Sequence, residues 1–209
     1  MVFLPDCHPL VMMSDIYSAN AAWFFGVKMF NKNVMVVIAD GIEELEAVSI
    51  IDVLRRAQVG VRVSSVEDRE ITGANSIKIM ADSIYADEAI EDYDGIILPG
   101  GTNGARLFAA YSPLLKDIKD FVKDKKLVAA ICASPALVLA KSGILDNKKA
   151  TCYPQFKDKI PNFVDEKVVE DGNIITSQGP GTALAFALKL AQRLAGEKIA
   201  LEVQTGMLA

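Results

Sequence analysis

Histidine is nearly absent from this chain of 209 residues. The single histidine, His8, lies near the amino terminus, ahead of the first segment with a strand pattern. A Cys-His dyad, a Ser-His-Asp triad and a histidine-rich metal site all need histidine beside the reacting group. We therefore exclude these three kinds of site from the folded part of the chain and expect no bound metal.

Sequence motifs that bind nucleotides are also lacking. Neither GxxxxGKS nor GxxxxGKT occurs, and no GxGxxG follows the first predicted strand. The 22 Lys and Arg residues are outnumbered by 27 Asp and Glu residues, which gives a formal net charge of -5. Such a chain has no basic surface field of the kind that neutralises phosphates. We expect no cofactor and no stable complex with nucleic acid.

Cysteine is sparse, and long apolar runs are missing. There are only three cysteines, at positions 7, 132 and 152, and a small, odd number of cysteines does not indicate a disulfide framework. No stretch of about 18 apolar residues could cross a membrane. We therefore expect a protein of the reducing cytoplasm that does not insert into membranes.

The length and composition suit one folded domain with a short extension. A single core serves up to about 250 residues, and a hydrophobic fraction of 51% with 23% charged residues is typical of globular proteins. Residues 1–28 show neither strand alternation nor a capped helix. Asp6 and Asp15 argue against a secretory signal, and the lack of Arg before Arg55 argues against a transit peptide. We predict an extension over 1–28 and one domain over 29–209.

From residue 33 onward, short β-branched runs alternate with longer helical stretches. Strands are predicted at 33–39, 60–66, 94–101, 127–132 and 149–152, and helices at 43–57, 112–125, 133–143 and 182–195. Ser112 is the expected cap of the second helix and Gly143 the expected stop of the third. A hairpin off the main sheet is predicted at 70–82, and another turns at Asp171 and Gly172. This alternation predicts a doubly wound, Rossmann-like α/β sandwich whose ligands meet the carboxyl ends of the strands.

Cys132 stands where an apolar strand stops and a helix starts. In nucleophile-elbow enzymes this geometry presents a side chain at the top of a sheet. A helix N-terminus aimed at the sulfur can lower a thiol pKa to roughly 3.5 to 7.5. The alternative is a small buried hydrophobic residue, which is what most free cysteines are. Position alone does not choose between the two.

Three glutamates follow the turn at Asp40 and Gly41, at the same edge of the predicted sheet. Glu43 and Glu44 suit a first helical turn, where the helix dipole favours acidic side chains. Glu46 should turn inward, where an ionised carboxylate is costly unless it is protonated or paired. A protonated Glu46 could donate a hydrogen bond to a thiolate and serve as a general acid or base.

Two loops could complete a site around Cys132. Gly100 and Gly101 end the predicted strand 94–101, and their amides, with that of Ala133, could bind a developing oxyanion. The segment SQGPGT (177–182) precedes the last helix and centres on Pro180. It is either a loop that closes over a ligand or a stiff connector.

Five motifs occur in order along the chain: ADGIEELEAV (39–48), ILPGG (97–101), AAICASP (129–135), KDKIP (157–161) and TSQGPGT (176–182). Together they resemble the ThiJ/PfpI superfamily, in particular its parkinsonism-associated deglycase branch and the bacterial ThiJ/YajL-type proteins. The resemblance implies a flavodoxin-like fold of the class I glutamine amidotransferase-like group, a homodimer and no cofactor. It also implies that Cys132 is the nucleophile, Glu46 the buried acid, and the amides of Gly101 and Ala133 the oxyanion hole.

The resemblance implies a glutathione-independent glyoxalase or deglycase. Such an enzyme acts on 2-oxoaldehydes such as methylglyoxal, or on their early adducts with proteins or nucleotides. The alternative from the same family is a redox sensor or oxidative-stress chaperone that uses oxidation of Cys132. An inert structural relative is a third interpretation.

The chain departs from related sequences at three positions. Tyr153 replaces a histidine found in several animal members, which would leave proton transfer to Glu46. Ala133 replaces the histidine of the protease branch, so peptidase and amidotransferase activities are not expected. Asn75 lies where some relatives use arginine to bind the oxidised cysteine. The predicted dimer would pack through Leu45, Ile50 and Ile51 of the first helix.

Overall fold

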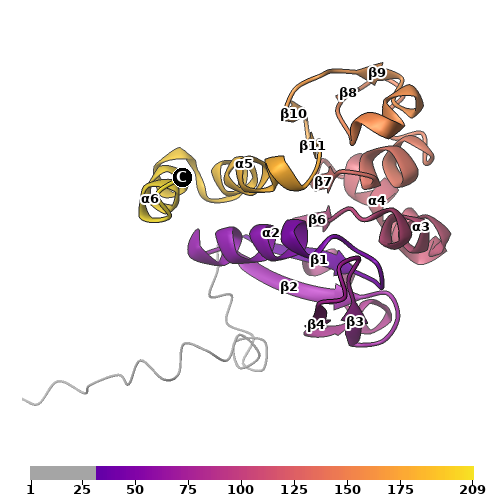
Figure 1. Cartoon of the computed structure of the whole chain (residues 1–209), viewed down its shortest axis with the longest axis horizontal. Coiled ribbons are helices and arrows are strands. Elements are labelled where there is room, and N and C mark those ends of the chain that lie inside the picture. The colour runs from indigo at the N-terminus through magenta and orange to yellow at the C-terminus, as the bar shows by residue number, and fades with distance from the viewer. Residues whose placement is uncertain (1–31) are drawn as a thin grey trace, which may run out of the picture.

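A seven-stranded sheet forms the centre of the fold (Figure 1). The computed structural model describes residues 32–209, so the expected extension over 1–28 and the domain start at residue 29 lie outside the described part. The strands, in spatial order, are β10 (Val168–Asp171), β11 (Ile174–Ser177), β7 (Leu127–Ile131), β6 (Gly95–Leu98), β1 (Asn33–Ile38), β2 (Gly60–Ser65) and β5 (Ser83–Ile84). Every residue of β1, β6 and β7 is buried, as expected of apolar strands covered on both faces.

The order of the strands creates a switch point between β1 and β6. Neighbouring strands run parallel except for the antiparallel pair β10 and β11. The five central parallel strands lie in the order 2-1-3-4-5 of their sequence, which is the flavodoxin-like order. The chain therefore moves one way from β1 to β2 and the other way from β6 to β7 and β11. The predicted doubly wound α/β fold is confirmed.

Helices cover both faces of the sheet. Helix α2 (Glu44–Arg56) packs against α5 (Ala183–Ala195) and contacts β1 and β2, whereas α4 (Ser112–Lys123) contacts β6 and β7. Because the β1–β2 and β6–β7 connections run in opposite directions, right-handed crossovers place α2 and α4 on opposite faces. Figure 1 shows α6 (Glu197–Gly206) beside α5 and α3 (Thr102–Ala110) beside α4. Within residues 32–209, none of the helices has the length and apolar character that crossing a membrane requires.

The segment 70–82 forms the predicted hairpin outside the main sheet. Strands β3 (Glu70–Thr72) and β4 (Lys78–Met80) pair antiparallel in a sheet of their own. The tip of the hairpin turns back onto the loop after β1, where the amide of Gly41 donates to the carbonyl of Thr72 at 2.8 Å. The hairpin is therefore attached to the edge of the sheet at which β1 ends.

The strand predicted at 149–152 is shorter than expected and lies outside the main sheet. Only β8 (Lys149–Ala150) is a strand, and it pairs with β9 (Asn162–Phe163). The next amide, of Thr151, donates to Oγ1 of Thr176 at 2.9 Å, and the amide of Tyr153 donates to the carbonyl of Cys132 at 2.8 Å. These bonds take the place of the strand-to-strand hydrogen bonds expected for residues 151–152, and they bring Tyr153 to the end of β7.

Two predicted helices differ from the structure in detail. Ser112 is the first residue of α4 and its side chain makes no capping hydrogen bond, so the predicted cap is wrong. The helix predicted at 133–143 is a π-helical segment, η4 (Pro135–Ala140), and Gly143 follows it at φ 76°. The remaining short turns of helix are η2 (Tyr85–Asp87), η3 (Ile90–Asp92), η5 (Pro154–Lys159) and η6 (Pro180–Thr182).

Candidate active site

Three adjacent strand ends carry most of the residues selected from the sequence. Helix α2 after β1 carries Glu46, the turn after β6 holds Gly100 and Gly101, and Cys132 directly follows β7. Strand β6 pairs with both β1 and β7, so these three ends meet at the carboxyl edge of the sheet. This edge lies at the switch point, where open α/β sheets bind ligands.

Cys132 has a left-handed backbone conformation, with φ 64°. A residue other than glycine is strained there, and such strain is typical of the sharp strand-to-helix turn of a nucleophile elbow. Two backbone hydrogen bonds hold the conformation: the Cys132 amide donates to the carbonyl of Ser177 at 3.0 Å, and its carbonyl accepts from Tyr153. The residue is partly exposed. The backbone of this partly exposed residue is thus held in place on both sides.

Glu46 lies fully buried beside this thiol, with 0% of its surface exposed. Its Oε2 accepts a hydrogen bond from the amide of Gly100 at 2.7 Å, and the Cys132 thiol lies close enough to the carboxylate to lower its pKa. Within residues 32–209, no group bonds to the second oxygen, Oε1. One oxygen of Glu46 is therefore anchored, and the carboxyl retains capacity to bind or release a proton.

Burial raises the pKa of Glu46 to about 7, although hydrogen bonds from Gly100 and Cys132 oppose the rise. The nearby charge of Glu43 adds to it. Near neutral pH the carboxyl therefore populates both protonation states. A pKa close to the working pH is the property that a general acid or base needs.

Burial also raises the pKa of the Cys132 thiol, to about 12, and the negative charge of Glu46 raises it further. Hydrogen bonds from the amides of Gly101 and Ala133 act in the opposite direction. In the resting site, burial and the charge of Glu46 act against the lowering of this pKa that a helix N-terminus can produce. The following helix, η4, has only six residues and begins at Pro135, three residues after Cys132.

The glycine pair is required by the close packing of the two loops. A Cβ on Gly100 would lie 2.4 Å from Cβ of Cys132 and 2.7 Å from Oε2 of Glu46. Gly101 has φ 85°, and a Cβ there would lie 2.3 Å from the carbonyl oxygen of Gly41. The amides of Gly101 and Ala133 lie close enough to the Cys132 sulfur to lower its pKa. The position suits binding of a thiolate or of an oxyanion formed at that sulfur.

The third loop, SQGPGT, borders the site where its Gly179 packs against Tyr153. Tyr153 is 42% exposed, and a Cβ on Gly179 would lie 3.2 Å from its ring. The loop is internally bonded, since Oγ1 of Thr182 lies 2.7 Å from Oγ of Ser177 and accepts from the Gly179 amide at 3.0 Å. Pro180 begins η6 behind Gly179. This bonding favours the stiff connector over the mobile loop.

Sequence analysis missed Ser134, which joins two of the site loops. Its hydroxyl donates to the carbonyl of Pro99 at 2.6 Å, and the residue is fully buried. This bond ties the segment after Cys132 to the turn that carries Gly100. A small polar residue within the apolar context of AAICASP is the only sequence signal for it.

Of two further residues noted in the sequence, one keeps its interpretation and the other does not. Ile50 has no exposed surface and packs in the core, so it cannot contribute to the predicted dimer. Cys152 is also buried, and its thiol donates to the carbonyl of Tyr153 at 3.3 Å; both fit the interpretation of its sequence position as strand filling, not as part of the site. Among residues 32–209, no cluster of three or more His, Cys, Asp or Glu side chains could hold a metal ion.

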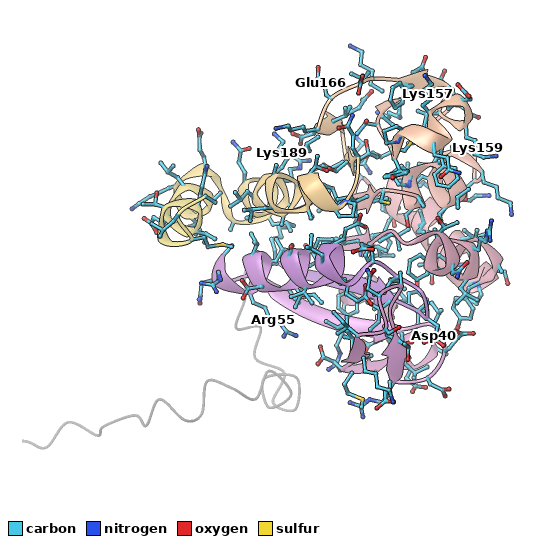
Figure 2. All side chains as sticks on the ribbon, in the orientation of Figure 1. Asp40, Arg55, Lys157, Lys159, Glu166 and Lys189 are labelled. Carbon is cyan, nitrogen blue, oxygen red and sulfur yellow. The ribbon has the colours of Figure 1, made fainter. Side chains whose placement is uncertain are left out.

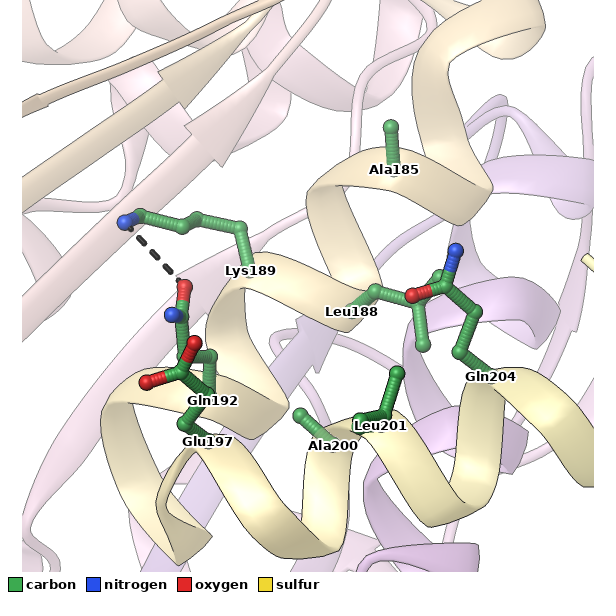
Figure 3. A pocket seen from close by; sticks show the side chains of 8 residues that line it. All are labelled: Ala185, Leu188, Lys189, Gln192, Glu197, Ala200, Leu201 and Gln204. Carbon is green, nitrogen blue, oxygen red and sulfur yellow. Dashed lines mark hydrogen bonds between the residues drawn. The ribbon is translucent and has the colours of Figure 1, made fainter.

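A separate groove of about 300 Å³ lies between α5 and α6 (Figure 3). It is lined by Ala185, Leu188, Lys189, Gln192, Glu197, Ala200, Leu201 and Gln204. Lys189 crosses one end, where it donates to Gln192 at 3.3 Å and pairs with Glu170 at 2.7 Å. None of the residues selected from the sequence lines this groove.

Known proteins share this arrangement of motifs and fold. The model described as "DJ-1/PfpI family" matches residues 32–193. Protein dj-1beta of Drosophila melanogaster is 40% identical over 183 residues, which cover 85% of this chain and 97% of the fly protein. The chain belongs to the DJ-1/PfpI family. The structure of oxidised Toxoplasma gondii DJ-1 has a TM-score of 0.82 at 39% identity, covering 85% of this chain and 98% of that one.

Other DJ-1/PfpI relatives differ in length or in the activity that their names state. Protein DJ-1 homolog B of Arabidopsis thaliana is 40% identical over 84% of this chain, but the match spans only 41% of the plant protein. The chain thus spans about two fifths of that relative. A Schizosaccharomyces pombe protein named glutathione-independent glyoxalase DJ-1 is 32% identical over 78% of this chain and 92% of its own length.

Proposed function

We propose that this DJ-1/PfpI protein is a glutathione-independent glyoxalase or deglycase that uses Cys132 as nucleophile and Glu46 as general acid and base. The observation that carries the proposal is the contact between the Cys132 thiol and the buried Glu46 carboxylate, whose pKa is raised to about 7. A nucleophile beside a base that is itself held in place is the usual arrangement for covalent catalysis. The yeast relative with a glyoxalase name supports this choice.

The reaction begins with the thiol of Cys132 and methylglyoxal. As the sulfur attacks the aldehyde carbon, the thiol proton passes to Glu46, so a preformed thiolate is not required. The aldehyde oxygen gains negative charge and is stabilised by the amides of Gly101 and Ala133. Return of a proton to this oxygen gives a hemithioacetal on Cys132.

The second half of the reaction moves a proton between two carbons of the bound substrate. Glu46 removes the hydrogen of the former aldehyde carbon and a proton returns to the neighbouring carbon, which yields a thioester of lactate. Water then cleaves the thioester and releases lactate and the free thiol. The sum is methylglyoxal plus water giving lactic acid, with no net oxidation and no cofactor consumed. Early aldehyde adducts on proteins or nucleotides would react with Cys132 at the same carbon, the one that was the aldehyde carbon of methylglyoxal.

The test is lactate formation from methylglyoxal by purified, freshly reduced protein. Wild type is expected to turn over without glutathione, whereas Cys132→Ala should have no activity above background. Cys152→Ala is the matched control, because it removes a buried thiol that contacts neither Glu46 nor the oxyanion amides in the described structure. Absence of lactate with reduced wild-type protein contradicts the proposal.

A second candidate function is a redox sensor or chaperone that uses oxidation of Cys132. Two observations favour it: Cys132 is partly exposed, and the similar Toxoplasma protein is described as oxidised. Mild peroxide followed by mass spectrometry would measure oxygen gained at each cysteine. Selective gain of two oxygens at Cys132, in a protein without aldehyde turnover, would favour the sensor over the enzyme.

We further propose a homodimer in which apolar residues of α2 and the hairpin meet a second copy. Leu45, Val48, Ile77 and Met80 are each between 52% and 60% exposed. Leu45 and Val48 lie three residues apart on α2, one turn of a helix, and Glu44, next to Leu45, accepts a hydrogen bond from the amide of Ile77. Exposed apolar groups gathered in this way are typical of association surfaces.

A further inference from the structure

Glu44 is a buried carboxylate that the proposed chemistry does not use. It is the first residue of α2 and only 3% exposed, and no lysine or arginine pairs with it within residues 32–209. Its carboxylate instead accepts hydrogen bonds from the tip of the β3–β4 hairpin: Oε1 from the amides of Asn75 at 2.7 Å and Ile77 at 3.2 Å, and Oε2 from Nδ2 of Asn75 at 2.9 Å. Burial acts to raise its pKa, but these bonds dominate and lower it.

Hydrogen bonds join the hairpin tip to the loop after β1 at several points. The amide of Thr72 donates to Oδ1 of Asp40 at 2.7 Å, and the amide of Ala74 donates to the carbonyl of Ile42 at 2.8 Å. Figure 2 shows Asp40 at the hairpin side of the molecule. Only glycine fits at position 73 between these bonds, because a Cβ there would lie 2.2 Å from Oε1 of Glu44. Tip and loop therefore form one closely packed layer.

The other side of the same loop supports the oxyanion turn. The amide of Glu43 donates to the carbonyl of Gly100 at 3.1 Å, and the amide of Gly104 donates to the carbonyl of Gly41 at 3.2 Å. Gly101 packs so closely on this loop that its missing Cβ would lie 2.6 Å from the Glu43 amide. The position of the Gly101 amide, which faces the Cys132 sulfur, thus depends on a loop held from behind by the hairpin.

We infer that Glu44 is a positioning residue for the Cys132 site: it holds the hairpin tip, residues 72–77, against loop 40–44 and so fixes the oxyanion turn at Gly100 and Gly101. The inference deepens the proposed function, since it concerns the amide that would stabilise the reacting oxygen. Glu44 acts through the backbone, because its carboxylate bonds to amides of the hairpin tip, whereas the neighbouring charge that raises the pKa of Glu46 is that of Glu43.

The experiment compares Glu44→Ala, Glu44→Gln and Asn75→Ala with wild type. Glutamine keeps an oxygen for the amides of Asn75 and Ile77 but places an NH₂ group against Nδ2 of Asn75, so its effect should be intermediate. Lys78→Ala is the matched control, because it removes the ion pair with Glu70 in the same hairpin without touching loop 40–44. Urea unfolding measures the stability of each variant.

Two readouts of Cys132 distinguish positioning from a purely structural role. Glu44→Ala should slow alkylation of Cys132 by iodoacetamide between pH 7 and 9 by about tenfold, because a displaced Gly101 amide stabilises the thiolate less. It should lower kcat for methylglyoxal by about 10- to 100-fold with little change in KM, the scale expected for a misplaced reacting group. Glu44→Gln and Asn75→Ala should lose less, and Lys78→Ala should match wild type in both readouts.

The alkylation readout does not depend on any turnover. If wild type forms no lactate, the proposed function fails while the role of Glu44 is still decided by Cys132 reactivity. If the alkylation rate of Cys132 in Glu44→Ala is within twofold of the wild-type rate, the inference is overturned. Any loss of stability in Glu44→Ala would then reflect only the attachment of the hairpin. Should Glu44→Ala fail to fold, the same criterion applies to Glu44→Gln and Asn75→Ala.

Discussion

The carboxylate of Glu46 accepts a hydrogen bond from the amide of Gly100 across 54 residues of sequence, at 2.7 Å. This bond joins the helix after β1 to the turn after β6, on either side of the switch point. It holds one carboxyl oxygen still while Oε1 has no bonded partner in residues 32–209. A proton exchanged with Cys132 therefore changes the charge of a group whose position is already fixed.

Replacing Glu46 by glutamine should separate the reactivity of the thiol from turnover. Glutamine keeps an acceptor for the Gly100 amide but cannot take a proton, so lactate formation should fall by about 10² or more. The pKa of Cys132 should fall at the same time, because the charge of Glu46 now raises it. Steady-state kinetics and the pH dependence of iodoacetamide alkylation measure the two effects.

The control for this substitution is Glu43→Gln, which removes a carboxylate from the same turn. The charge of Glu43 raises the pKa of Glu46. Glu43→Gln should therefore retain turnover, and the acidic limb of its pH–rate profile should move to lower pH. Glu46→Asp withdraws the carboxyl by about one methylene and should weaken activity less than glutamine does. Equal turnover in Glu46→Gln and wild type would remove Glu46 from the mechanism.

Glu46 should also make the stability of the protein depend on pH. Its pKa is raised from an ordinary value of 4.5 to about 7 in the folded state, so the folded protein binds more protons than the unfolded chain between these values. The free energy of unfolding should then decrease as pH rises through this window, by about 3 kcal/mol from this group. Below pH 4.5 the carboxyl is protonated in both states and the full stability remains.

The measurement compares urea unfolding of wild type and Glu46→Gln at intervals from pH 4 to pH 8. Glutamine does not titrate, so the difference between the two proteins should change across the window and be constant outside it. A difference that is independent of pH would show that Glu46 titrates at its ordinary value in the folded protein.

Much of the fold could be predicted because the apolar pattern of its central strands is strong. Strands β1, β2, β6 and β7 lie within the segments predicted from β-branched and apolar runs. The predicted hairpin after them forms between β10 and β11, but its turn is Gly172 and Asn173, one residue later than expected, because Asp171 pairs with Ile174. Helices α3 and α6 were not predicted. The glycine-containing segment of α3, TNGARLFAA, has no cap signal, and α6 follows α5 after only Gly196.

The site was predicted in its residues but not in its energetics. Cys132 and Glu46 could be selected because a strand end and an inward helical position are visible in sequence. The direction of the thiol pKa could not, since it depends on how completely the folded chain buries Cys132 and on the charge of Glu46 beside it. Glu44 was assigned to the helix dipole because its partners, Asn75 and Ile77, lie on a hairpin about thirty residues away.

The proposed homodimer predicts a specific effect of one surface charge. Leu45→Glu places a carboxylate in the middle of the exposed apolar residues of α2 and should convert a dimer to a monomer, because burying an unpaired charge is costly. Sedimentation at micromolar concentration measures the mass of each protein. Leu201→Glu, on the exposed side of α6, is the control and should leave the mass unchanged. Sedimentation of wild type as a monomer would overturn the dimer.

The strained backbone of Cys132 should be visible as a stability difference between two inactive variants. Cys132→Ala retains a Cβ at φ 64°, where an L residue is disfavoured by about 1 to 2 kcal/mol, whereas Cys132→Gly does not. Glycine also makes the unfolded chain more flexible, at a cost of about 0.4 to 1 kcal/mol, so the expected net gain over alanine is about 1 kcal/mol. Urea unfolding of both variants provides the comparison, with Ala133→Gly as the control because Ala133 is not among the residues with positive φ. A glycine variant less stable than the alanine variant would show that the elbow stores no strain, and that the direction of the thiol is set by the bonds to Ser177 and Tyr153 alone.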